Sequence, residues 1–267
     1  MPKFTLLVGS LATASMAFAG WLFTSPGVPD QPRYLTAPVT ELSPLTPEER
    51  QLLTEVVQDN QGLQTLSVQA DVVLKRPKKV SLTAEFAAER PGRSRVLLRS
   101  WFYLECDAGS DGEHVWYWFR RKDPEHVFQV PYAQAEAAGF LDPVWLTECL
   151  GMRRLDPAKA TLGKVGPYLV WRQPEGDGVK VTAVDGDSKL IVGSYLYNAA
   201  NELVSFSEVL DHVRVAGRTL PKRVVTGWPE REMFTLWSLK EYTVNQPIDA
   251  GRWQVPAHGA LVPGETE

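Results

Sequence analysis

Apolar and polar residues alternate along many stretches of the chain, with the period of two that is typical of a half-buried β-strand. Between residues 80 and 130 the pattern predicts strands over 80–88, 95–105, 114–120 and 126–130, separated by turns rich in Gly, Pro and Asp. An opening strand over 63–74 precedes them, and six more follow, over 168–172, 179–184, 189–197, 203–214, 219–226 and 234–244. We therefore expect about eleven antiparallel strands joined by short loops.

The aromatic residues in the central part of the chain occupy neighbouring positions. Trp116, Tyr117, Trp118 and Phe119 follow one another directly, so alternate side chains point to opposite faces of the sheet. A sheet that is apolar on both faces must be covered on both, or must leave one face available to an apolar ligand.

Two capped helices are predicted among these strands. Thr46 and Glu49 form a capping box around Pro47, and an apolar stripe extends the helix over 47–61. Asp142 can cap a second, shorter helix over 143–150. The predicted fold is mainly β with α: a single curved antiparallel sheet with both helices on one face.

The two ends of the chain lie outside this predicted domain, which spans residues 46–256. Lys3, an apolar run and Ala17-Phe18-Ala19 predict a signal peptide over 1–19, or an uncleaved anchor extending to residue 23. With either a signal peptide or an anchor, the body of the protein is expected to leave the cytoplasm. Residues 24–45 are rich in proline and predict an extended linker, and residues 257–267 predict a flexible tail.

The net charge bears on the kind of partner, and the cysteine content bears on the presence of a disulfide. Without Lys3, 27 basic side chains stand against 32 acidic ones, a net charge of −5, which argues against a nucleic-acid partner. In an oxidising compartment Cys106 and Cys149 are either a disulfide or two buried free thiols.

The sequence shows no arrangement typical of an active site. The four histidines lack the spacing of a zinc protease, and no nucleophile elbow or nucleotide-binding glycine loop is present. Glu208 and His212 are interpreted as a surface pair. We therefore predict a protein that is not an enzyme, with no metal and no cofactor.

Several motifs, in order along the chain, resemble the LolA/LolB-like superfamily of envelope lipoprotein carriers. They are the capped first helix, Arg90-Pro91, Asp111-Gly112 before Val115-Trp116-Tyr117, and the closing segments 211–221, 245–249 and 253–256. The resemblance covers residues 45–256. It departs from the family in the middle helical segment, and neither LolB's protruding hydrophobic loop nor its lipid-bearing cysteine is recognised.

The resemblance implies an unclosed half-barrel whose concave face is covered by helices and holds lipid chains. It also implies that Arg90 matches an arginine that helps to hold the lid closed. The function expected is a monomeric periplasmic or envelope carrier of lipid or lipidated protein, which exchanges cargo with a membrane-associated donor or acceptor. The alternative is a sensor or protein-interaction module on the same fold, and a third possibility is a structural domain with a filled core.

Strand parity and helix pattern select the side chains expected to line the cavity. They are Val96, Leu98, Phe102, Leu104, Trp116, Trp118, Trp145 and Leu146. A basic rim is expected at one end of the sheet, because alternate turns of a meander lie at the same end. Its members would be Arg90 with Arg93, Arg120, Arg121 and Lys122.

Overall fold

The computed structural model describes residues 27–37, 39, 41–76, 78–132, 147, 149–152, 160–258 and 260–263. The predicted signal peptide or anchor lies outside these residues. Among the helices that are described, none has the length and apolar character needed to cross a membrane.

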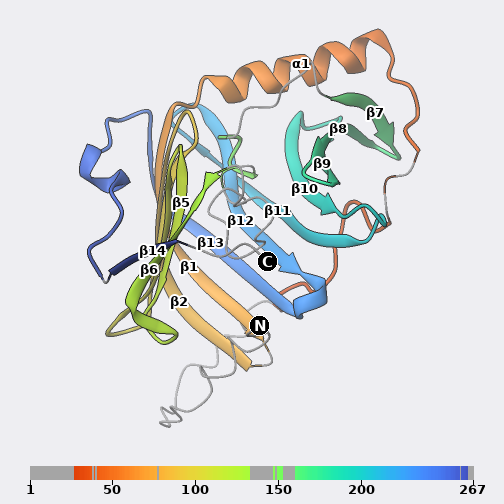
Figure 1. Ribbon diagram of the computed structural model, residues 1–267. Coiled ribbons are helices and arrows are strands. Elements are labelled where there is room, and N and C mark those ends of the chain that lie inside the picture. Colours follow the sequence, from red (N-terminus) through yellow and green to blue (C-terminus); the bar gives the residue numbers. More distant parts are fainter. Residues whose placement is uncertain are drawn as a thin grey trace.

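One open sheet of 14 strands forms the body of the molecule (Figure 1). Its order is β14-β6-β5-β4-β3-β2-β1-β13-β12-β11-β10-β9-β8-β7, antiparallel throughout except that β14 pairs parallel with β6. The strands are β1 (Thr65–Arg76), β2 (Lys78–Glu89), β3 (Arg93–Arg99), β4 (Leu104–Asp111), β5 (His114–Phe119), β6 (Asp123–Pro131), β7 (Thr161–Val165), β8 (Tyr168–Glu175), β9 (Gly178–Asp185), β10 (Leu190–Tyr197), β11 (Leu203–Val215), β12 (Arg218–Trp228), β13 (Met233–Val244) and β14 (Ala260–Pro263). Two short 3₁₀ helices, η3 (Pro229–Arg231) and η4 (Ala250–Trp253), complete the described elements.

The first helix begins and ends where the sequence predicts. In α1 (Pro47–Gln61), the Thr46 amide donates to the Glu49 carboxylate at 2.8 Å and the Glu49 amide donates to the Thr46 hydroxyl at 3.2 Å. This reciprocal capping box satisfies two amides that a helix N-terminus otherwise leaves without partners. Figure 1 shows α1 crossing above β7–β10.

One face of the sheet, which we call the helix-bearing face, is the face on which α1 and residues 149–152 pack. Leu53 and Val56 of α1 pack against apolar residues of β8, β9 and β10. Cys149, Leu150 and Met152 pack with apolar residues of β1–β4 and β11–β13. The expected second helix, 143–150, lies mostly outside the described residues, so cover by two helices stays a prediction.

The opposite face is covered by segments from near both ends of the chain. Val28, Leu35 and Val39 are buried in a cluster with apolar residues of β8–β13, so the segment expected to be a spacer packs on the sheet instead. At the other end, Trp253 is buried and Val255 packs against β5 and β6. Residues 260–263, expected to belong to a flexible tail, form β14.

Three strands, β4, β7 and β14, were not predicted. β4 was missed because its Asp, Gly and Ser residues resemble a turn, although five of its eight positions are buried. Its Gly109 is required by close packing: a Cβ there would lie 2.4 Å from the Trp116 ring. Conversely, the single strand predicted over 95–105 is two strands, because Trp101, Phe102 and Tyr103 form the turn between β3 and β4.

Candidate ligand-binding site

A pocket of about 570 Å³ opens on the helix-bearing side of the molecule, where β10 and β11 separate. These two strands pair only from Gly193 with Glu208 to Tyr197 with Leu203, while β11 continues to Val215 beside β12. Four segments enclose the opening: α1, residues 149–151, residues 188–191 and the β11–β12 hairpin from His212 to Pro221. A volume of this size is typical of small-ligand sites, which occupy about 300–1,000 Å³.

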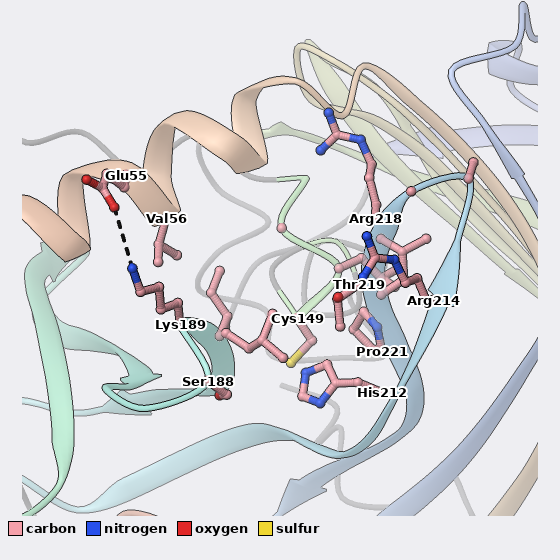
Figure 2. Close-up of a pocket in the computed structure, with 17 residues that line it drawn as sticks. Glu55, Val56, Cys149, Ser188, Lys189, His212, Arg214, Arg218, Thr219 and Pro221 are labelled. Carbon is pink, nitrogen blue, oxygen red and sulfur yellow. Dashed lines mark ion pairs between the residues drawn. The ribbon is translucent and has the colours of Figure 1, made fainter.

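The pocket combines apolar and cationic side chains (Figure 2). The apolar lining is made by Val56, Cys149, Leu150, Leu190, Ile191 and Leu220. Arg214 and Arg218 come from the β11–β12 hairpin, and Lys189 lies on the other side of the opening beside α1. Glu55, the one carboxylate among the described lining residues, faces Lys189 with 3.9 Å between Oε2 and Nζ.

Two titratable side chains in the pocket favour their neutral forms. Burial lowers the pKa of His212, which weakens its tendency to carry a proton at neutral pH. Burial raises the pKa of the Cys149 thiol to about 12, and a thiol at such a value is a poor nucleophile. These residues contribute shape and polarity to the pocket and offer no activated group.

Arg90 joins the start of β1 to the segment that borders the pocket. Its Nε donates to the Leu63 carbonyl at 2.8 Å, and its Nη2 donates to the Gly151 carbonyl at 2.6 Å. The guanidinium is half-buried, and this burial lowers its pKa. The Met152 amide donates to the Thr147 carbonyl. Through its bond to the Gly151 carbonyl, Arg90 helps to hold residues 149–152 against the sheet.

The residues predicted to line one cavity are divided by the structure. Val96 and Leu98 lie on the helix-bearing face, in the same cluster as Leu150, although neither lines the pocket. Trp116, Trp118 and Leu104 pack on the opposite face, so their assignment to the shared cavity was wrong. Tyr117 and Phe119 occupy the expected face in their place. Trp145 and Leu146 lie outside the described residues.

Phe102 packs on neither face of the sheet, because it belongs to an exposed turn. Trp101, Phe102 and Tyr103 are 91%, 78% and 54% exposed, and they are the exposed large hydrophobic side chains of the described chain. Neighbouring rings in the turn contact edge to face, with centroids 6.3 Å apart. We call this segment the aromatic turn. It is an exposed hydrophobic turn within the single strand predicted over 95–105.

The predicted basic rim does not exist as one cluster. The extra reversal at the aromatic turn places Arg90 and Arg93 at one end of the strands and the Arg120–Lys122 turn at the other. Consistent with this, the Arg120 guanidinium lies 4.0 Å from the Tyr103 ring centroid, whereas the Arg90–Gly92 turn adjoins Gly112. Arg93 pairs with Glu89, and Arg120 and Arg121 both pair with Glu105.

The structure also bears on the two cysteines, on the expected Glu208–His212 pair and on metal binding. Cys106 and Cys149 are both buried and free, so the disulfide alternative was wrong and the two-thiol alternative holds. Glu208 and His212 do not form the expected surface pair, because Glu208 is buried and accepts hydrogen bonds from the Arg33 and Tyr34 amides and the Tyr195 hydroxyl. No group of His, Cys, Asp and Glu suited to a metal ion occurs within the described ranges.

The open antiparallel sheet with helix α1 on one face is a LolA/LolB-like fold. The resemblance noted in the sequence is thereby confirmed at the level of the fold. No protein-family model and no curated protein sequence matches the chain.

Solved structures supply the comparison. A LolA superfamily protein from Nitrosomonas europaea is 10% identical, with a TM-score of 0.54 over 76% of this chain and 96% of that one. An outer membrane lipoprotein-sorting protein domain from Vibrio parahaemolyticus is 8% identical, with a TM-score of 0.56 over 77% and 97%. A DUF1329 family protein from Desulfovibrio piger is 12% identical, with a TM-score of 0.55 over 82% and 98%.

Proposed function

We propose that this protein is a non-enzymatic carrier of the cell envelope that binds lipid or the acyl chains of lipidated protein. The observation that carries the proposal is the pocket on the helix-bearing side, in which buried apolar side chains of α1 and residues 149–151 adjoin a polar, cationic opening. The fold shared with a LolA superfamily protein and a lipoprotein-sorting domain supports it. The export segment predicted from the sequence supports a location in the periplasm or cell envelope, with anchoring to the inner membrane if the N-terminus is not cleaved.

Acyl chains supply the driving force for binding. Moving a methylene group out of water contributes about 0.8 kcal/mol, so a chain of ordinary length gains several kcal/mol above the cost of association. Capture and release need no covalent step. They need only that the segment bordering the pocket, residues 149–151, can move to open it.

Arg90 has the contacts expected of a latch for that segment. Its hydrogen bonds to Leu63 and Gly151 connect the sheet to the segment that borders the pocket. The hydrogen bond to the Gly151 carbonyl is one contact that must break for that segment to move, while β1 and β2 stay paired along their whole length. In this proposal the segment moves and the sheet remains rigid.

Native mass spectrometry of the protein purified without detergent tests the carrier function. We expect the protein to retain a co-purified lipid or acyl chain, which a neutral detergent displaces. Absence of any bound lipid, together with no binding of an added fluorescent fatty acid, would contradict the carrier function. That result would leave the alternative of a sensor or interaction module on the same fold.

Cargo exchange is proposed to occur where the aromatic turn meets a membrane. Aromatic side chains partition to the membrane interface. The adjacent Arg120, Arg121 and Lys122 attract an anionic surface, with the charge of the two arginines partly offset by their shared partner Glu105. This end of the sheet therefore has both features of a surface that docks on anionic lipid.

We expect the double substitution Trp101→Ser and Phe102→Ser to weaken binding to vesicles of phosphatidylglycerol and phosphatidylcholine by about tenfold or more. The measurement is co-sedimentation with vesicles, after checking that the thermal unfolding midpoint is unchanged.

Two charge reversals form a matched pair for the same assay. Arg121→Glu, beside the aromatic turn, should weaken vesicle binding, whereas Arg93→Glu, at the other end of the strands, should not. Equal effects of the two reversals, or full binding by the Trp101 and Phe102 variant, would rule out docking through this turn.

A further inference from the structure

We propose that the pocket recognises an anionic amphiphile, with the acidic head group held at the Arg214 side of the opening and the acyl chain on the apolar lining. The inference rests on the proposed function and adds the chemical class of the ligand. The recognised group is a phosphate or a carboxylate attached to an acyl chain.

The charge of the lining favours an anion. Among the lining residues that the structure describes, Lys189, Arg214 and Arg218 are cationic and Glu55 alone is anionic. Glu55 is placed beside Lys189, on the far side of the opening from the hairpin that carries both arginines. His212 adds little charge at neutral pH, because burial lowers its pKa. The hairpin side of the pocket is therefore cationic.

Arg214 is the side chain best placed to act. It is exposed at the pocket and carries no ion pair or side-chain hydrogen bond to any other residue that the structure describes. This sets it apart from the arginines that are tied to protein acids, including Arg93 to Glu89, Arg95 to Asp107 and Arg223 to Asp211. A guanidinium that is not committed to a protein carboxylate can bind a phosphate or a carboxylate through two parallel hydrogen bonds.

The remainder of the lining selects an amphiphile over a free anion. Leu150 and Ile191 lie behind the cationic residues, and Val56 of α1 closes the same space. Leu190, in the same lining, is only partly buried, so a small anion alone would leave its side chain in contact with water, whereas an attached acyl chain would cover it. Head group and chain therefore occupy neighbouring parts of one site.

Isothermal titration with two lipids of equal chain length tests this assignment. The probes are lysophosphatidylglycerol, which is anionic, and the corresponding neutral monoacylglycerol, both below their critical micelle concentrations. We expect lysophosphatidylglycerol to bind about tenfold more tightly, as one charge-assisted contact allows, and we expect this preference to shrink as salt is raised.

Variants connect the preference to Arg214. Arg214→Gln should remove the preference while leaving the monoacylglycerol affinity unchanged, and Arg214→Lys should restore part of it. The matched control is Arg50→Gln, on the exposed side of α1 and outside the pocket lining, which should behave as the unchanged protein does. All variants should retain the same thermal unfolding midpoint.

Each contrary outcome has a distinct meaning. Equal binding of the two lipids, unaffected by Arg214→Gln, would overturn the anionic head-group assignment and leave the carrier function standing. Binding of inorganic phosphate as tight as that of lysophosphatidylglycerol would overturn the amphiphile assignment in favour of a free-anion site. Failure of both lipids to bind would overturn the head-group assignment and the proposed carrier function together.

Discussion

Replacing Asp107 with alanine is expected to lower the free energy of unfolding by about 3–5 kcal/mol, because it leaves a largely buried arginine without its partner. The Asp107 side chain is fully buried on β4, and it accepts hydrogen bonds from Arg95 Nε at 2.9 Å and Nη2 at 2.7 Å. The same carboxylate lies 2.9 Å from His258 Nε2, and Arg95 Nη1 donates to the Arg252 carbonyl. One carboxylate thus connects two central strands to the C-terminal segment.

Urea unfolding of the two proteins measures this loss. The matched control is Asp71→Ala, because Asp71 pairs with Lys240 at 2.9 Å but is more than half exposed. An exposed pair of this kind is worth at most about 1 kcal/mol. If the two substitutions reduced stability equally, the buried Arg95–Asp107 pair would not have the structural role assigned to it.

Replacing Glu208 with alanine is expected to cost about 3 kcal/mol, since each buried donor left without an acceptor costs about 1–3 kcal/mol. Glu208 accepts hydrogen bonds from the Arg33 amide at 2.8 Å, the Tyr34 amide at 3.1 Å and the Tyr195 hydroxyl at 2.7 Å. These bonds hold the N-terminal segment on the opposite face. Limited proteolysis should therefore cut Glu208→Ala within residues 27–45 faster than the unchanged protein, whereas Glu85→Ala, at a partly exposed glutamate on β2, should not differ.

The pH dependence of Glu208 follows from its burial, which raises the pKa of its carboxyl group. The folded state then holds this proton more tightly than the unfolded chain does. The linked stabilisation is fully present below the unfolded-state pKa and is lost as the pH rises through the folded-state pKa. In urea unfolding, the stability of the unchanged protein relative to Glu208→Gln should increase as the pH is lowered from neutral toward about 4. A constant difference across this range would contradict the raised pKa.

The parts of the fold that the sequence predicted correctly are those with strong local signals. The capping box at Thr46 and Glu49 fixes the start of α1 through contacts three residues apart, so no distant residue has to be known. Most strands were likewise recognisable from alternation alone. At these positions the local sequence pattern alone is sufficient to predict the helix or strand that the structure shows.

The misassignments arose where distant partners overrule local preference. Asp107 and Gly109 favour turns in isolation, yet Arg95 pairs with one and the Trp116 ring packs over the other, so both belong to a strand. The run Trp101–Tyr103 has strand composition and is an exposed turn. Missing that reversal changed the end of the sheet assigned to Arg120.

The candidate pocket was beyond prediction for a related reason. Its lining comes from four segments between residues 55 and 221, and its opening depends on where β10 ceases to pair with β11. Lys189 and Arg214 each occur near turns, where a charged residue is ordinarily solvated. Only the assembled sheet brings their side chains around a common apolar surface.

Both edges of the open sheet are occupied by segments from near the ends of the described chain. At one edge β14 pairs with β6 through residues 260–263. At the other, Ser43 pairs with Lys164 of β7, through hydrogen bonds of 3.1 Å and 3.0 Å. Unpaired edge strands are templates for the addition of strands from other molecules. These two short segments therefore limit growth of the sheet from chain to chain, and shortening the protein at either end would favour self-association through the exposed edge.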